Sequence, residues 1–178
     1  VKTPAERTAF LDTFVQAADN WTRSAIAAAA TEQAPAFLTS ALAFRRADAL
    51  LEFGTVVTPA ALPASAGSLL VAAAGAGPQA APLAAVIVRA IGRMETGTVV
   101  LDAPTTTALQ KLVDNPATAA AALPVVARWD KSGSLGASAD RQSRALLDVL
   151  GAAATNDDRR VEVAASLLAF PPRRAEAR

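Results

Sequence analysis

The sequence predicts an all-α protein built as a right-handed, α-solenoid-like stack of antiparallel helical hairpins. Hydrophobic residues make up 52% of the 178 residues but aromatic residues only 4%, so alanine supplies most of the apolar content. Alanine has the highest helix propensity, whereas a β-sandwich would need Val, Ile, Thr and aromatic residues in alternation. In addition, an apolar helix followed by an Asp/Asn corner and an alanine-rich helix recurs at residues 15–30, 109–123 and 146–168.

Each of these corners has side chains suited to ending one helix and starting the next. Asp and Asn tolerate left-handed backbone angles and are good helix N-caps. We expect Asp19 or Asn20 to cap the second helix of the first hairpin. At the middle corner we expect Asn115 to cap the following helix, with Pro116 at its first position. Residues 156–158 place acceptors and negative charge at the start of the last helix.

The helices of the first third of the chain follow from their apolar spacing. A helix over residues 4–18 forms the clearest hairpin with a helix over 21–30. A third helix opens at Pro35, and residues 48–53 are also expected to be helical. Residues 55–63 contain two prolines and β-branched residues, so we expect an irregular connection there.

The segment from residue 53 to residue 88 contains no charged residue. Prolines and glycines divide it into pieces shorter than the roughly 20 apolar residues that a membrane-spanning helix needs. We therefore expect two buried helices, at residues 64–74 and 79–93, and no membrane span. Residues 96–103 are the only stretch that resembles a strand, and because it is isolated we expect an extended loop.

The remaining helices are expected at residues 105–113, 117–129, 138–151 and 157–170. In the third of these, Leu146, Leu147 and Leu150 are expected to face inward. Together the helices form a single helical-repeat domain over residues 1–170. Residues 171–178 are expected to be a tail or linker, because the two prolines that begin it stop the preceding helix.

The first corner resembles the corner between the two helices of HEAT-type repeats. Asp19, Trp21 and Arg23 follow the family's order of an Asp, a hydrophobic residue and an Arg two positions later, before small and aliphatic core residues. Asp158 and Arg160 resemble this order more loosely. The middle corner departs from it, because a proline and small residues occupy the aliphatic and Arg positions. The structural corner residues are then Asp19, Trp21, Arg23, Asp114, Asn115, Asp158 and Arg160.

A narrower resemblance covers most of the chain. The sequences of residues 21–38 (WTRSAIAAAATEQAPAFL) and 122–135 (ALPVVARWDKSGSL) are similar to the helical-repeat segment of large exported bacterial dehydrogenase-like proteins. Those proteins join a propeller and a c-type cytochrome module to helical repeats. The resemblance implies an accessory segment whose catalytic and haem-bearing parts lie elsewhere.

Composition argues against several classes of function. Seventeen Lys and Arg residues balance 16 Asp and Glu, a formal net charge of +1, so a nucleic-acid partner is not expected. The chain has no cysteine and no histidine. It therefore lacks a thiolate nucleophile, a haem-attachment motif, the commonest general base and a common metal ligand. We expect no catalytic residues, no cofactor and no metal.

Two loops and two tryptophans are candidate binding sites. Residues 75–78 lack the Gly-Lys-Ser/Thr ending of a phosphate loop, and residues 130–134 lack the later acidic ligands of a calcium loop. Trp21 and Trp129 each lie near a corner, where packing between hairpins is the expected role. Trp129 is also a candidate contact for a partner. Arg23 is expected to pair with a carboxylate such as Asp19 or with corner carbonyls.

These observations predict a non-catalytic scaffold or docking domain whose partner is a protein or a neighbouring domain of the same polypeptide. The alternative is a helical bundle that binds an apolar small molecule or lipid among the uncharged helices. An enclosed apolar cavity would favour the alternative, and an open groove the scaffold. The chain begins at Val1, which indicates either a removed leader or a piece of a longer polypeptide, and we favour the fragment. The narrower resemblance implies a larger exported assembly and a periplasmic location, with a cytoplasmic one still open. The partner, the number of true repeats, the oligomeric state and the biological process are not encoded in any motif.

Overall fold

The computed structural model of the chain describes residues 3–95, 97–153 and 155–169, and every regular element within them is a helix. This confirms the all-α prediction. The predicted tail at 171–178 lies outside the described residues. The α-helices are α1 (Pro4–Gln16), α2 (Asn20–Ala30), α3 (Ala34–Leu42), α4 (Leu51–Ala61), α5 (Ala66–Ala74), α6 (Ala81–Gly92), α7 (Ala103–Asp114), α8 (Ala119–Trp129), α9 (Gly136–Gly151) and α10 (Asp157–Ala169). Three 3-10 helices lie between them: η1 (Thr31–Gln33), η2 (Ala47–Leu50) and η3 (Pro78–Ala80).

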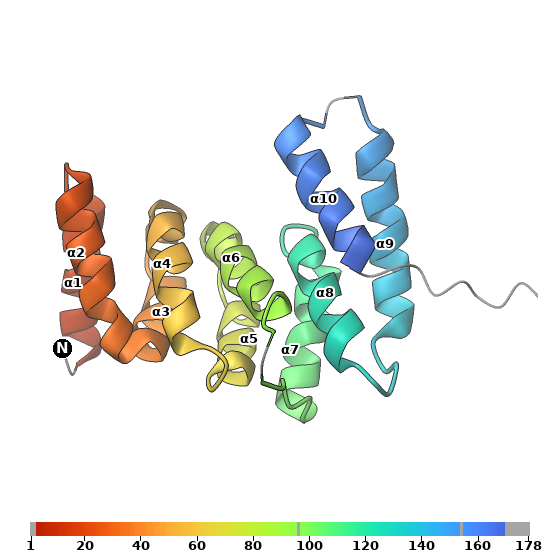
Figure 1. Cartoon of the computed structure of the whole chain (residues 1–178), viewed down its shortest axis with the longest axis horizontal. Coiled ribbons are helices and arrows are strands. Elements are labelled where there is room, and N and C mark those ends of the chain that lie inside the picture. The colour runs from red at the N-terminus through yellow and green to blue at the C-terminus, as the bar shows by residue number, and fades with distance from the viewer. Residues whose placement is uncertain (1–2, 96, 154, 170–178) are drawn as a thin grey trace, which may run out of the picture.

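The helices form two layers. Consecutive helices pair in the order α1 with α2, α3 with α4, and so on to α9 with α10, and each pair packs against the next. Odd-numbered helices contact the next odd-numbered helix, and even-numbered helices the next even-numbered one. In Figure 1 the pairs α1–α2 to α7–α8 stand side by side in a row, and the α9–α10 hairpin rises out of it. We call α1–α8 the row and the α9–α10 hairpin the arm.

The core of the row combines a small aromatic cluster with many alanines. The rings of Phe14 and Phe53 meet edge to face with their centroids 5.3 Å apart, and Phe37 lies 6.2 Å from Phe53. All three side chains are buried, and such pairs add to the free energy gained by burial. Elsewhere, alanines fill the interfaces. Ala119 to Ala122 are all buried in α8, for example, so neighbouring helices approach closely.

The helix α4 corrects the prediction of an irregular connection over residues 55–63. It runs from Leu51 to Ala61 and continues through both Gly54 and Pro59. Phe53, Val57 and Ala61, spaced by four residues, are all buried, so the helix is maintained by the face that it packs inward. Pro59 lies near the C-terminal end, where its missing N–H removes only one hydrogen bond of the helix.

Gly54 is needed where it is because α4 and α6 approach closely there. A Cβ atom at this position would lie 2.4 Å from Cδ1 of the buried Leu83. Gly97 has a φ of +85°, and a Cβ there would lie 2.5 Å from Cβ of Pro63. Gly97 belongs to the connection before α7, which has no regular structure among its described residues, as the sequence predicted.

Side chains cap the starts of α1 and α2, and the cap of α2 by Asp19 was predicted. Thr3 and Glu6 form a capping box at the start of α1, and the Asp19 side chain accepts a hydrogen bond from the backbone N–H of Thr22 at the start of α2. The hydrogen bonds from the backbone and the hydroxyl of Thr22 hold the pKa of Asp19 below its ordinary value. Both caps satisfy backbone donors that the first turn of a helix leaves unpaired.

The arm departs from prediction in one respect. Leu146 of α9 is buried, and Leu150 is partly buried against the core. Leu147, however, is half exposed, so its predicted inward orientation is wrong. Within residues 3–95, 97–153 and 155–169, helices of the row pack against only one side of the arm, and Leu147 lies away from that side.

Candidate docking surface

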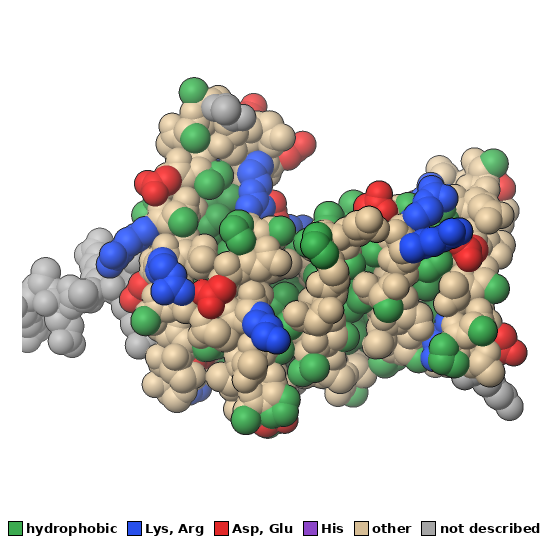
Figure 2. Space-filling model, turned by 180° about the vertical axis from the view of Figure 1, so that it is seen from behind, with side chains coloured by type: hydrophobic (Ala, Val, Ile, Leu, Met, Phe, Trp, Pro, Cys, Tyr) green, Lys and Arg blue, Asp and Glu red, His purple; other side chains and the backbone are tan. Residues whose placement is uncertain are grey.

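A groove lies where the arm meets the row. It has a volume of about 830 Å³ and is lined by α6, α8 and α10. Small residues form much of its lining, among them Gly92, Ala120 and Pro124 of the row and Ala165 of the arm. Figure 2, which views the molecule from behind, shows the arm projecting beyond the row, with the outline of the molecule dropping from one to the other. We call this groove the saddle groove.

Small side chains are what keep the saddle groove open. A Cβ atom at Gly92 would lie 3.2 Å from Cβ of Pro124, which shows how closely α6 and α8 pack beneath it. Large side chains at Ala120 or Ala165 would occupy the hollow itself. The groove is therefore a consequence of the alanine-rich composition of these helices.

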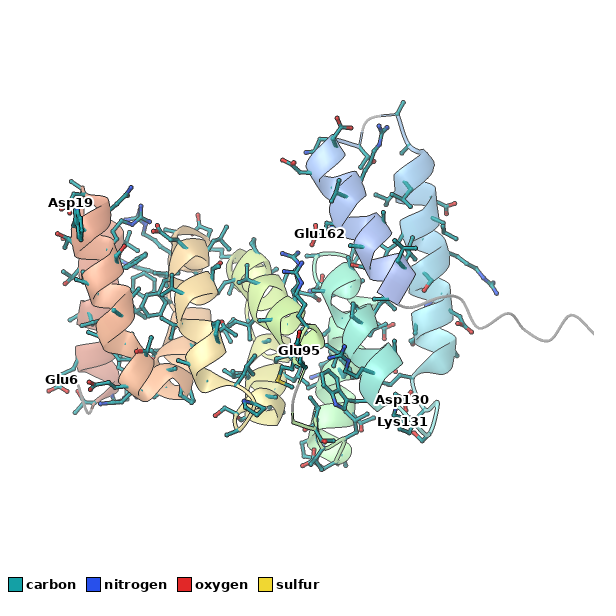
Figure 3. All side chains as sticks on the ribbon, in the orientation of Figure 1. Glu6, Asp19, Glu95, Asp130, Lys131 and Glu162 are labelled. Atoms are coloured by element: carbon teal, nitrogen blue, oxygen red, sulfur yellow. The ribbon has the colours of Figure 1, made fainter. Side chains whose placement is uncertain are left out.

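One ion pair ties the arm to the row beside the groove, and a second, within α10, shares its carboxylate. The carboxylate of Glu162, on α10, accepts hydrogen bonds from Arg89 on α6 and from Arg159, whose Nη1 lies 2.8 Å from Oε2. The side chains of Glu162 and Arg89 are both partly buried. Figure 3 shows Glu162 on the side of the arm that faces the row. Arg89 and Glu162 are 73 residues apart, so this pair joins distant parts of the chain.

Further charges in the groove have no partner of opposite sign among the described residues. Arg128 donates to the backbone carbonyl of Met94, and its guanidinium lies 5.4 Å from the Trp129 ring centroid. Neither Arg128 nor the exposed Arg93 forms a salt bridge within residues 3–95, 97–153 and 155–169, and neither do Asp158 and Glu95. The groove thus presents two arginines from the row and one carboxylate from the arm, with Glu95 beside the arginines.

A second hollow continues the same face of the molecule. It has a volume of about 460 Å³ and lies between α4 and α6, with Pro59 and Val86 in its lining. Arg89 and Arg93 line both hollows. The even-numbered helices therefore present one recessed surface from α4 to α10, with these two arginines in the middle.

Two residues of the first predicted corner have structural roles. Asp19 caps α2, as expected. Arg23 does not pair with Asp19, however. Its Nη2 lies 3.1 Å from Oε2 of Glu52 on α4, and its guanidinium lies 4.9 Å from the centroid of the Phe14 ring. Arg23 thus joins the first hairpin to the second through a partner that sequence spacing could not indicate.

Of the two tryptophans, Trp21 differs from expectation. Trp21 is 87% exposed, so the prediction that it packs between hairpins is wrong. Asp19 and Trp21 lie at an end of the row that no other hairpin covers, as Figure 3 shows for Asp19. Trp129 is partly buried against the core and stacks with Arg128 at the saddle groove.

The middle corner corrects another prediction. Asn115 does not cap α8, which begins at Ala119 with Thr118 at its N-cap. Instead the Asn115 side chain accepts a hydrogen bond from the N–H of Ala117, 3.0 Å away, and forms a local turn. Three residues separate Asn115 from α8, so Pro116 lies in this turn. The Asn115 side chain therefore forms a local turn instead of capping α8.

Asp114, the other residue of this corner, connects the row to the arm. Its carboxylate accepts hydrogen bonds from Gln110 and from Nη2 of Arg141 on α9, at 2.6 and 2.7 Å. The hydrogen bond from Gln110 and the nearby Arg141 hold the pKa of Asp114 below its ordinary value. Asp114 is exposed, so this contact orients the arm more than it stabilises the fold.

The third corner caps α10 as expected, through Asn156, whose side chain accepts a hydrogen bond from the N–H of Arg159 at 2.9 Å. Arg160 lies 3.5 Å from Asp157 and donates to the carbonyl of Ala152. Asp158 lies in the saddle groove. Of the predicted corner residues, it is the only one that lines this groove.

The loop before the arm is organised by one buried carboxylate. Asp130 is 6% exposed and accepts hydrogen bonds from the backbone N–H of Ser134 and Leu135 and from the hydroxyls of Ser132 and Ser134. Burial acts to raise the pKa of Asp130, but these hydrogen bonds outweigh it and the pKa is lowered. Within the described residues, no three His, Cys, Asp or Glu side chains are placed to hold a metal ion.

Sequence reasoning missed the arginines of the groove. The charges of Arg89 and Arg93, at the end of the helix predicted over residues 79–93, were the available signal. Nothing in the spacing showed that Glu162 would reach Arg89. The partners of these residues depend on how α10 packs, which local pattern does not determine.

Comparisons with known proteins identify no relative, since no protein-family model, curated protein or solved structure matches the chain. In the part of the chain that the structure describes, each helix is too short or insufficiently apolar to cross a membrane.

Proposed function

We propose that this protein is a non-catalytic helical-repeat scaffold, a HEAT-like right-handed α-solenoid that docks a protein or a neighbouring domain of its own polypeptide. The docking surface is the recessed face of the even-numbered helices, centred on the saddle groove. By the narrower resemblance, the chain belongs to a larger exported, periplasmic assembly or redox protein of bacterial origin.

The contacts between helices support the solenoid assignment. Repeat proteins stack units so that each contacts only its neighbours, and their concave faces bind partners. Here odd-numbered helices pack on odd-numbered ones and even-numbered on even-numbered ones. The recessed face also combines small apolar residues with arginines that have no carboxylate partner among the described residues. Arginine is enriched at protein interfaces.

The alternative, an apolar small molecule or lipid held among the uncharged helices, has less support. The large side chains of that segment are packed against one another: Phe53, Val57, Leu70, Leu83 and Ile87 are fully buried. The two hollows described above are open to solvent, and an open groove fits a protein surface better than a lipid. That the scaffold is non-catalytic rests on composition, because the chain contains no histidine and no cysteine.

Site-specific photocrosslinking tests the proposal. A photoreactive amino acid is placed at Ala165 in the saddle groove and, in a matched variant, at the exposed Ala9 of α1 on the opposite layer. In cells that naturally contain the protein, we expect a discrete protein adduct from position 165 and none from position 9. Mass spectrometry then identifies the partner and its contact site. Equal labelling at both positions, or none at either, would contradict the proposed docking surface.

A further inference from the structure

The saddle groove carries unpaired charges of opposite sign on its two sides. Asp158 lies in the first turn of α10, near the tip of the arm, whereas Arg93 and Arg128 lie at the C-terminal ends of α6 and α8 in the row. None of the three forms a salt bridge with another described residue. Glu95 lies near the two arginines, so that side of the groove keeps one net positive charge.

An exposed apolar stripe follows the arm beside these charges. Val161 and Leu168 are 69% and 83% exposed, and with Ala165 they lie at positions i, i+7 and i+4, on one face of α10. Val161 and Ala165 also line the saddle groove, so the stripe forms its lip. Large apolar side chains exposed in a row are typical of an interaction surface.

From this arrangement we infer that the occupant of the saddle groove is a second copy of the same chain. The two copies are related by a two-fold axis, and the arm of each lies in the groove of the other. Asp158 of each copy then meets Arg93 and Arg128 of its partner, and the two apolar stripes are covered together. This inference rests on the proposed function, because it names the partner of that docking surface.

Self-complementarity is what favours a second copy over another protein. In a two-fold interface the same patch faces itself, so each charge must find its opposite elsewhere in the patch. The saddle groove meets this condition, with an unpaired carboxylate on the arm and unpaired arginines on the row. It also meets the condition in shape, since the arm projects beyond the row (Figure 2) and the groove lies beside it. Ala165, at the centre of the apolar stripe, has a small side chain that lets two copies of α10 approach closely.

Charge reversal in the purified full-length chain tests the inference. Sedimentation equilibrium over a range of concentrations is expected to show a dimer for the wild type. Asp158→Arg and Arg93→Asp are each expected to weaken dimerisation at least about tenfold, because each reversal replaces two symmetry-related attractions by repulsions. An equimolar mixture of the two variants is expected to form a heterodimer, since the reversed charges then face each other.

Asp48→Arg and Arg46→Asp are matched controls, because both residues are exposed and have no salt bridge with another described residue. They are expected to leave dimerisation unchanged, and thermal unfolding verifies that all four variants fold. A wild type that stays monomeric, variants that dimerise like the wild type, or a mixture that stays monomeric would each overturn the inference. If crosslinking at Ala165 captures a different protein while the chain is monomeric, the docking proposal survives and the second copy does not.

Discussion

The interior of the row and its junction with the arm rely on different kinds of interaction. In the row, Phe14, Phe37 and Phe53 form a buried cluster, and α4 approaches α6 so closely that a Cβ atom at Gly54 would displace the buried side chain of Leu83. The arm buries Leu146, Val163 and Leu167 in the same hydrophobic core as the row. At its junction with the row, however, it also has two long-range ion pairs. They are the contacts from Arg89 to Glu162 and from Arg141 to Asp114.

This difference separates stability from orientation. Burial of apolar surface contributes most of the free energy of folding and has no preferred direction. Exposed and half-buried ion pairs contribute little free energy but fix geometry. Apolar burial, in the row and where the arm packs on it, therefore supplies most of the stability of the domain, whereas the charged contacts contribute to the angle at which the arm borders the saddle groove.

The largest expected effect is in the row. Phe53→Ala removes a fully buried ring that contacts two other rings, and it should lower the free energy of unfolding by about 3–5 kcal/mol. Urea denaturation followed by circular dichroism measures this. Val56→Ala, on the exposed side of the same helix, should cost less than about 1 kcal/mol. Similar losses for the two variants would show that the aromatic cluster does not dominate the core.

An intermediate effect is expected at the joint between row and arm. Asp130→Asn replaces a buried carboxylate that accepts four hydrogen bonds and should cost about 1–3 kcal/mol at pH 7. Because the pKa of Asp130 is lowered in the folded state, its ionised form stabilises the fold above the unfolded-state pKa of about 4. This contribution is lost as the pH falls from there through the folded-state pKa.

Urea denaturation of the wild type and Asp130→Asn at pH 7 and pH 3 checks the sign. The difference in free energy of unfolding between them should shrink at the lower pH. A constant difference would mean that Asp130 titrates normally in the folded protein. Asp48→Asn, at an exposed carboxylate, is the matched control.

The smallest effect on global stability is expected in the arm. Glu162→Gln weakens its charged contacts with Arg89 and Arg159 and should cost about 1 kcal/mol. Hydrogen exchange should nevertheless accelerate in α10 and not in α4, because the loss is local. Glu95→Gln, in the same groove but without a salt bridge to another described residue, should leave exchange unchanged. Acceleration throughout the chain would contradict the separation of row and arm.

The sequence allowed the helices to be predicted more accurately than their contacts. Helix starts at Thr3 and Asp19 follow from local capping chemistry, which depends on residues only a few positions apart. The wrong interpretation of residues 55–63 came from giving Pro59 more weight than the spacing of Phe53, Val57 and Ala61. That spacing was the better signal, because tertiary packing overrides the local cost of one proline.

The candidate site could be predicted only in part. Arg93 and Asp158 were visible as charged residues of two helices, but their meeting in one groove depends on how α10 packs over α8 and α6. Trp21 was expected inside because it is large and apolar. It is exposed because no hairpin precedes α1 in the described structure. Long-range packing of this kind leaves no local pattern in a single sequence.

The neighbour-to-neighbour packing of the helices also bears on how fast the chain folds. Every extensive contact between α-helices joins elements no more than two positions apart along the chain, so few long loops must close before contacts form. Proteins with such short sequence separations fold in microseconds to milliseconds. The pair Arg89–Glu162, 73 residues apart, spans a much longer stretch of the chain. Closing a longer loop costs more conformational entropy, so we expect this contact at the saddle groove to form later than the contacts between neighbouring helices.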